Sequence, residues 1–296
     1  MTPAPSRDTA AGRAYNDLRN LARREGRDPG EFLVLYALEG FLARLTVSKH
    51  ASHFVLKGGV LLSAFTARRA TRDIDLAANG IDNDITGIEH VVRKIIATHI
   101  DDGLEFDSES VAGESIRDDA DYPGARISLA ARLATARIAL HIDVNFGDPI
   151  WPAPASVELP LLLGGTLELR GYPDHMVLAE KIVTAIARGD QNTRWRDFVD
   201  IATIVSTRRV RHADLRTAIE IVAEYRQVPL QPLGPLLERI PDTAQTKWSA
   251  WRRKQRLEAT TPEQLGDLLA ICTEFTDPVL EATADSRVRD PTSKRW

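Results

Sequence analysis

The chain has 296 residues, of which 43% are hydrophobic and 27% charged, and this is the composition of an ordinary globular protein. A single cysteine excludes an intramolecular disulfide, and a net charge of -4 at pH 7 argues against a uniformly basic nucleic-acid-binding protein. We expect no signal peptide, because the N-terminal residues contain no apolar h-region, and no membrane span, because no apolar run approaches roughly 20 residues. The lone cysteine fits a reducing compartment, so we expect a cytoplasmic location.

The N-terminal region, residues 1–49, is predicted to be a helical arm. It contains a polar helix over 11–26 and a more apolar helix over 30–47, where leucine and phenylalanine recur at helical spacing. Residues 50–170 are expected to form a mixed α/β core. In this core a short helix over 60–66 follows a pair of glycines.

The core contains the strands that carry the candidate chemistry. The sequence TRDIDLA is typical of a strand with Ile74 and Leu76 on one face and Asp73 and Asp75 on the other, because side chains alternate along a strand. We expect an amphipathic helix over 84–99 and a strand over 104–111. Two further strands are expected within 122–148, joined near 133–136.

Residues 171–296 are predicted to be a helical C-terminal domain. Gly189 fits the position that follows a helix end, since glycine tolerates the left-handed backbone found there. The polar residues at the end of the chain are expected to fray. The fold class is therefore α/β (α+β), with a mixed sheet flanked by helices. The helices of the last domain are expected over 175–188, 193–207, 212–226, 230–239, 243–257 and 262–275.

Three aspartates are predicted to lie together on this sheet. Asp73 and Asp75 share one strand face, and Asp143 lies on the polar face of a later strand. If these strands are neighbours, the carboxylates converge and raise one another's pKa unless cations lie among them. Mg²⁺ suits such oxygen ligands, with Mn²⁺ as an alternative. The pattern therefore predicts a metal site made by Asp73, Asp75 and Asp143.

The glycine pair Gly58 and Gly59 lies directly before the short helix of the core. Glycines let backbone N–H groups approach a phosphate, with the N-terminus of the helix facing it. A phosphate cradle beside metal-binding carboxylates is the equipment of two-metal phosphoryl chemistry, in which one metal activates a hydroxyl and the other holds a triphosphate. Lys57 and Arg72 are further candidates for contact with the nucleotide.

The order of these motifs resembles that of the DNA polymerase β-like nucleotidyltransferases and, more narrowly, that of the AbiEii toxin family with its MenT-type members. The resemblance covers about residues 30–205. It rests on the sequences FVLKGG, TRDIDL, YPGARISL, IDVNFGD, AEKIVTAI and NTRWRDFVDI, in that order. A lone Asp-x-Asp would be weak support, because glycosyltransferases also use one.

The resemblance implies roles for residues in the later motifs. Lys181 is expected to contact the triphosphate. The candidates for the fourth motif are Asn192, Arg194, Asp197 and Asp200. Asp197 and Asp200 lie three residues apart and so share a helix face, which leaves open which of them is catalytic. One departure is that Gly59 replaces the small hydroxyl residue usual in the first motif, and this removes one phosphate donor.

The function implied by the resemblance is that of a Mg²⁺-dependent nucleotidyltransferase toxin. Such an enzyme transfers NMP from an NTP to an acceptor hydroxyl. The implied acceptor is the 3′ end of tRNA, whose extension would block aminoacylation and translation. We also expect a cognate antitoxin and a monomeric enzyme. Two alternatives stay open: an NTP-binding module that acts through a protein partner, and a transferase that modifies protein hydroxyls or sugars.

Two further features of the sequence bear on function. The segment TKWSAWRRKQR, residues 246–256, interleaves Trp248 and Trp251 with basic side chains. This pattern is typical of nucleic-acid contact and equally of a helix with tryptophans in the core. Thr71 stands two residues before Asp73, and its phosphorylation would add negative charge beside the carboxylates and block metal and nucleotide binding.

Overall fold

The structure is a computed structural model that describes residues 5–65, 71–81, 84–117, 123–281, 285–293 and 295–296. The chain forms two compact units. The first contains the residues up to Asp148 together with Pro154–Tyr172, and the second contains Pro149–Ala153 and Pro173–Trp296. In the described part of the chain, no helix combines the length and the apolar character that a membrane crossing requires.

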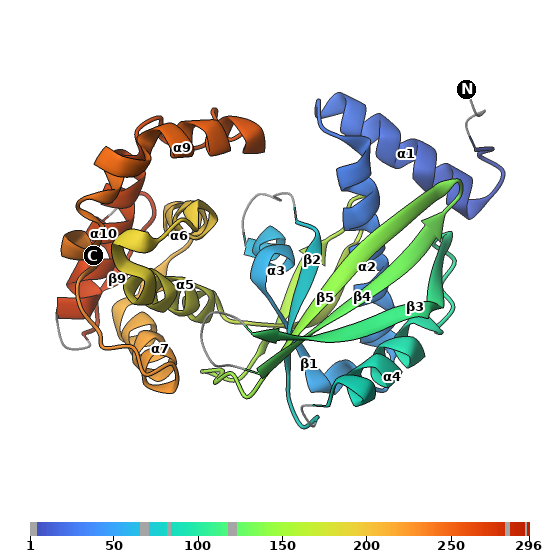
Figure 1. The fold of residues 1–296 in the computed structure, drawn as a ribbon, viewed down its shortest axis with the longest axis horizontal. Helices are drawn as coiled ribbons and strands as arrows, with labels where there is room; N and C mark the ends of the chain where they lie inside the picture. Colours follow the sequence, from blue (N-terminus) through green and yellow to red (C-terminus); the bar gives the residue numbers. More distant parts are fainter. Residues whose placement is uncertain (1–4, 66–70, 82–83, 118–122, 282–284, 294) are drawn as a thin grey trace. The chain divides into compact units, whose positions relative to one another are not determined.

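A mixed sheet is the centre of the first unit. Its described strands are β1 (Phe54–Lys57), β2 (Asp73–Ala78), β3 (Leu104–Arg117), β4 (Pro123–Leu133), β5 (Ala136–Phe146), β6 (Ala155–Pro160) and β7 (Thr166–Gly171). They lie in the order β3-β4-β5-β2-β1-β7-β6. Figure 1 labels β1 to β5. β2 pairs in parallel with β5 and antiparallel with β1, so the strand that carries Asp73 and Asp75 is an interior strand.

The predicted hairpin within 122–148 is confirmed, since β4 and β5 form an antiparallel pair. The strands meet at a turn in which Ala134 has a φ of 52°. Along β5 the buried side chains alternate, and Ile142 and Val144 are 0% and 1% exposed. This alternation puts Asp143 on the opposite face of the strand from the core.

Four helices accompany the sheet in the described part of the first unit: α1 (Ala10–Arg24), α2 (Pro29–Val47), α3 (Gly58–Phe65) and α4 (Ile85–Ile96). α2 begins where the Asp28 carboxylate accepts a hydrogen bond from the Gly30 N–H, which satisfies a donor that the helix start leaves unpaired. Deep in the fold, Arg44 of α2 donates to both carboxylate oxygens of Asp102, at 2.6 and 3.0 Å. This ion pair ties α2 to the residues before β3.

The second unit is mainly helical (Figure 1). Its described elements are α5 (Asp174–Arg188), α6 (Trp195–Thr207), α7 (His212–Tyr225), α8 (Leu233–Leu237), α9 (Ile240–Gln255), α10 (Leu265–Glu281) and the short strands β8 (Val210–Arg211) and β9 (Val288–Arg289). α5 ends at Gly189, which has a φ of 50°, so the predicted helix end is confirmed. The helix expected over 230–239 is shorter in the structure, where α8 spans only Leu233–Leu237.

The expectation that the last residues fray was wrong for the described part of that segment. β9 pairs with β8, and Arg289 is 6% exposed and donates to the Val205 carbonyl at 2.8 Å. The ring of Trp296 stacks on Phe275, with the centroids 5.1 Å apart. Polar composition alone missed this, because the contacts join residues that are far apart in the sequence.

Candidate active site

A row of charged side chains crosses four neighbouring strands of the sheet. Lys57 of β1 lies opposite Asp75 of β2. Asp75 in turn lies opposite Asp143 of β5, and Asp143 lies opposite Arg126 of β4. Side chains at paired positions of neighbouring strands lie on the same face of the sheet. The strands with Asp75 and Asp143 are thus neighbours, as the sequence required.

Asp75 is the most strongly perturbed carboxyl group of this row. It is half-buried, and its pKa is raised to about 6. Burial is the largest cause, and the negative charges of Asp73 and Asp143 add to it, while Lys57 and a hydrogen bond from the Gly59 backbone N–H lower the pKa. The face therefore concentrates negative charge that the protein only partly neutralises.

Gly58 is required by the position of the Asp75 side chain. The glycine is the first residue of α3 and has a φ of 67°, which is left-handed backbone. A Cβ at this position would lie 1.8 Å from Oδ2 of Asp75. The glycine pair thus begins a helix, as predicted, and the structure shows that Gly58 admits a carboxylate.

Asp73 lies two residues from Asp75 on the same strand face, and Thr71 contacts it. The Thr71 hydroxyl donates to Oδ1 of Asp73 at 2.8 Å, and Thr71 is 4% exposed. A kinase would reach this hydroxyl only after the residue has left that position. The neighbouring Arg72 is exposed, as a residue that contacts a soluble nucleotide must be.

Asp143 is held by an arginine that the sequence did not single out. Nε and Nη2 of Arg126 donate to the two carboxylate oxygens of Asp143 at 2.8 and 2.7 Å. This hydrogen bonding raises the pKa of the Arg126 guanidinium, so the arginine stays charged. The signal in the sequence was the position of Arg126 in YPGARISL, on a strand expected to pair with the one that carries Asp143.

The metal site predicted from the sequence can be tested against this arrangement. Among the residues that the structure describes, no group of three or more His, Cys, Asp or Glu side chains is placed to hold a metal ion. The donor types suit Mg²⁺, and Asp75 and Asp143 lie opposite each other in register. Asp143, however, already accepts both hydrogen bonds of a guanidinium fork, so the carboxylates fit a metal in chemistry but do not converge on one point.

Lys57 forms a buried ion pair. It is 7% exposed, and its Nζ lies 2.6 Å from Oδ2 of Asp148, a residue that the sequence had not indicated. Nζ also lies 5.3 Å from the centroid of the Tyr172 ring. The observed role of Lys57 is therefore that of a counter-ion to the acidic face, and contact with a nucleotide remains a proposal.

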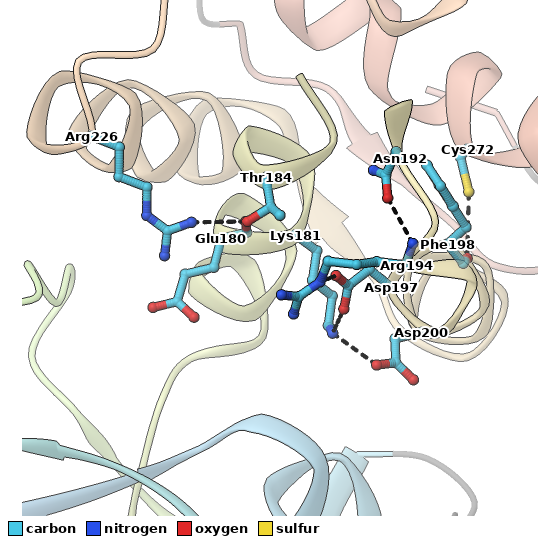
Figure 2. Close-up of polar contacts among 10 residues, drawn as sticks. All are labelled: Glu180, Lys181, Thr184, Asn192, Arg194, Asp197, Phe198, Asp200, Arg226 and Cys272. Atoms are coloured by element: carbon cyan, nitrogen blue, oxygen red, sulfur yellow. Dashed lines mark hydrogen bonds and ion pairs between the residues drawn. The ribbon is translucent and has the colours of Figure 1, made fainter. Parts of the chain in front are cut away.

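The later motifs form a second cluster, within the helical unit. Figure 2 shows Lys181 of α5 pointing toward Asp197 and Asp200 of α6. Its Nζ donates to Oδ1 of Asp197 and to Oδ2 of Asp200, each at 2.8 Å. Arg194 donates to the other oxygen of Asp197 at 2.5 Å. Both aspartates thus contact the lysine, and Asp197 bridges two cations.

The charges of this cluster stabilise one another. Burial by itself would lower the pKa of Lys181, but Asp200 and Asp197 outweigh it, and the net pKa is raised. Burial would raise the pKa of Asp197, but Lys181 and Arg194 outweigh it, and the net pKa is lowered. Lys181 is therefore a protonated cation at neutral pH and cannot serve as a general base.

A cavity of about 400 Å³ lies on the other face of the sheet. Its lining includes Leu56 and Leu76, which alternate with Lys57 and Asp75 along their strands. The candidate chemistry is thus on the opposite side of the sheet from this mostly apolar cavity.

The fold is similar to that of MenT4, a nucleotidyltransferase toxin from Mycobacterium tuberculosis H37Rv, with a TM-score of 0.56 and 18% identity over 90% of this chain and 91% of that chain. At this identity the likeness shows the fold alone.

Two structures from Helicobacter pylori are more distant. One is described as a nucleotidyltransferase and has a TM-score of 0.47 and 12% identity over 85% of this chain and 96% of that chain. The other, JHP933, has a TM-score of 0.44 and 14% identity over 82% of this chain and 90% of that chain. No curated protein matches the sequence.

The family is shown by the sequence itself. The model of the nucleotidyl transferase AbiEii toxin family, of type IV toxin–antitoxin systems, matches residues 40–271. Since this match spans most of the chain, the protein belongs to the AbiEii family, as its motifs predicted. It is a nucleotidyltransferase and the toxin of a type IV toxin–antitoxin system. The family implies an NTP substrate, usually a divalent metal, and a cognate antitoxin.

Proposed function

We propose that this toxin transfers NMP from an NTP to the hydroxyl at the 3′ end of tRNA. The observation that carries the proposal is the register of β2 and β5, which puts Asp75 opposite Asp143 with Asp73 on the same face. Clustered carboxylates beside a glycine turn are suited to phosphoryl transfer, in which positioning and charge stabilisation supply most of the catalysis.

The bonds change at the α-phosphorus of the NTP. The acceptor 3′-oxygen forms a bond to this phosphorus, and the bond to the β-phosphate oxygen breaks. Pyrophosphate leaves with the electron pair of that bond. The proton of the acceptor hydroxyl is released to the solvent. An RNA extended by one nucleotide no longer presents the natural end for aminoacylation, so translation stops.

Each proposed role belongs to a residue whose place has been described. Asp73 and Asp75, joined by Asp143 once its side chain turns away from Arg126, would hold Mg²⁺, or Mn²⁺ in its place, and the cation would neutralise charge on the triphosphate. The backbone at Gly58 and Gly59 would approach the phosphates. The roles of Lys57, Arg72, Lys181, Arg194, Asp197 and Asp200 toward the nucleotide rest on the family's motifs.

The decisive experiment is an incubation of the protein with bulk tRNA, Mg²⁺ and each α-³²P-labelled NTP in turn. Transfer predicts label on the RNA, at its 3′ end, and release of pyrophosphate. Label on protein or on a glycan would instead favour modification of another hydroxyl. Nucleotide binding without transfer would favour an NTP-binding module.

Two variants make the assay specific. Asp73→Asn removes one charge from the acidic face while keeping a group that can accept the hydrogen bond of Thr71, and we expect at least a hundredfold loss of transfer. Glu105→Gln removes a charge from an exposed pair with Arg132 on the same sheet and should transfer at the wild-type rate. The proposal fails if no NTP labels RNA, or if the two variants behave alike.

A further inference from the structure

One helix of the second unit presents basic side chains around a tryptophan. α9 contains Lys247, Trp251 and Lys254, at positions i, i+4 and i+7, and these spacings put the three side chains on one face of a helix. Lys247, Arg253 and Lys254 are exposed, and Trp251 is partly exposed. We call Lys247, Trp251 and Lys254 the α9 basic face, and Arg253 lies on another side of the helix.

The tryptophan of this face is held in place from below. Its ring stacks on that of Trp248, with centroids 5.5 Å apart and planes at 25°. Trp248 is completely buried, and its indole N–H donates to the Glu263 carbonyl at 3.1 Å. The interpretation that places the tryptophans in the core is therefore correct for Trp248. The ring of Trp251 packs against Trp248 on one side and is partly exposed to solvent.

The end of α9 is fixed as well. Nη2 of Arg252 donates to the carbonyls of Glu258 and Thr261 at 2.6 and 2.9 Å, and its Nε donates to the Thr261 hydroxyl at 3.0 Å. The arginine thereby fastens the loop that follows the helix. A surface whose side chains are already ordered loses less entropy when a ligand binds.

The cations of the α9 basic face lack acidic partners. Within the described residues, Lys247 and Lys254 make no ion pair, whereas exposed arginines elsewhere in the same unit do: Arg209 pairs with Asp290, and Arg211 with Asp214. The helix dipole explains cations in the last turn of a helix, such as Arg253 and Lys254. It explains neither Lys247, more than two turns from the helix end, nor the adjacent tryptophan.

We propose that the α9 basic face binds the acceptor RNA, with Lys247 and Lys254 on its phosphates and Trp251 stacked on an unpaired base. This inference rests on the proposed function, in which RNA is the acceptor. Lys247 and Lys254 are roughly 10 Å apart along the helix axis and so meet different phosphates. An acidic protein would satisfy the cations but would leave no planar partner for the tryptophan, so the combination favours a nucleic acid.

The test measures RNA binding rather than transfer. The affinity of the full-length protein for fluorescently labelled bulk tRNA is measured by anisotropy without NTP. We expect Lys247→Glu with Lys254→Glu to weaken binding at least tenfold. Changing both Lys247 and Lys254 to alanine should lower the magnitude of the slope of log affinity against log salt concentration by about 1.5–2, because two phosphate contacts are lost. Trp251→Ala should weaken binding roughly fivefold or more, and Trp251→Phe should retain most of the affinity.

The matched control is Arg23→Glu with Arg24→Glu, which makes the same charge change at the exposed end of α1. This control should bind tRNA as the wild type does. All variants should remain folded at the assay temperature, which thermal unfolding checks for each, and Trp251→Ala should lose some stability because its ring stacks on Trp248. An α9 variant that binds tRNA as tightly as the control overturns the inference. The inference is also overturned if poly-L-glutamate displaces labelled tRNA as well as unlabelled tRNA does, and if the affinity for the polymer is unchanged by Trp251→Ala.

Failure of this inference is distinguishable from failure of the proposed function. If the protein transfers NMP to tRNA, and the α9 variants bind tRNA as tightly as the wild type, the inference is overturned and the proposed function is not. Loss of tRNA binding in the α9 variants, in a protein that transfers no NMP to RNA, would support the α9 surface and overturn the proposed transfer reaction.

Discussion

Arg126 and Asp143 share a bidentate ion pair in which one guanidinium engages both oxygens of a carboxylate that the family's motifs assign to the metal. Charge-assisted pairs of this geometry are among the stronger polar contacts in proteins. A divalent cation would compete with the guanidinium for the same oxygens and would be repelled by its charge. In the proposed metal site, Arg126 would therefore set how readily Asp143 can take up a cation.

We predict that Arg126→Met tightens binding of Mn²⁺ about tenfold or more, since each charged hydrogen bond is worth on the order of 1.5–3 kcal/mol. Electron paramagnetic resonance of free Mn²⁺, without NTP or RNA, measures the affinity. Arg132→Met is the control, because Arg132 lies on the same strand and pairs with the exposed Glu105. Equal affinities in the two variants would show that Arg126 does not compete. In an Asp143→Asn background the effect of Arg126→Met should vanish.

Gly58→Ala is predicted to damage both stability and transfer. The left-handed backbone at φ 67° costs an alanine about 1 kcal/mol, and the new Cβ would also displace the Asp75 carboxylate. We expect a total loss of about 2–4 kcal/mol in the free energy of unfolding and a loss of transfer that exceeds it. Urea unfolding and the labelled-NTP assay measure the two effects.

Gly80→Ala separates strain from displacement. Gly80 has almost the same φ, 68°, but a Cβ there would meet only His53 Nδ1, at 3.7 Å. This variant should lose about 1 kcal/mol of stability and keep its activity. If both glycine variants lose transfer equally, the contact between Gly58 and Asp75 is not the reason.

Asp75→Asn is predicted to alter how stability depends on pH. The pKa of Asp75 is about 6 in the folded chain, above its ordinary value of 3.8, so the folded state binds the extra proton between these values. The contribution of Asp75 to stability therefore falls as pH rises from about 4 to 6. The asparagine variant should be about 1–3 kcal/mol more stable than wild type at pH 7.5 in EDTA, and equally stable below pH 4. Urea titrations at both pH values measure this, and a variant less stable at pH 7.5 would contradict it.

Asp197→Asn is predicted to destabilise the chain more than a surface substitution does. The change leaves Lys181 with one carboxylate and weakens the hold on Arg194, so we expect a loss of about 2–4 kcal/mol at pH 7. The folded pKa of Asp197 is lowered, so its stabilisation is complete above its unfolded pKa and disappears as pH falls through the folded pKa. Glu220→Gln, which breaks an exposed pair with Arg216, should lose only about 0.3–0.5 kcal/mol. Unfolding titrations from pH 7 to pH 3 should show the two variants converging.

Much of the fold was predictable from the sequence because it depends on local patterns. Alternation of apolar and polar residues marked β5, and the helical spacing of apolar residues marked α2. The strands β1, β6 and β7 were missed, since β1 has only four residues and all four are buried. A short apolar run without alternation carries no period that distinguishes a strand from other buried segments.

The candidate site was only partly predictable. Asp73, Asp75 and Asp143 could be placed on strand faces from their own sequences. Their partners could not be predicted. Arg126 meets the Asp143 carboxylate, and Asp148 meets the Lys57 ammonium group, only through the register and order of the strands. The same limit applied to Lys181, whose contacts with both Asp197 and Asp200 require the packing of two helices.

The position of β2 between β1 and β5 restricts how the acidic face can change. A strand at the edge of a sheet can slide or peel away, because one row of its peptide groups has no partner. β2 pairs with β5 along its whole length and with β1 over residues 75–78, and a slip by one residue would turn Asp73 and Asp75 into the core. Any rearrangement that accompanies a reaction on this face must therefore come from rotation about side-chain bonds, with the backbone of β2 as a fixed frame.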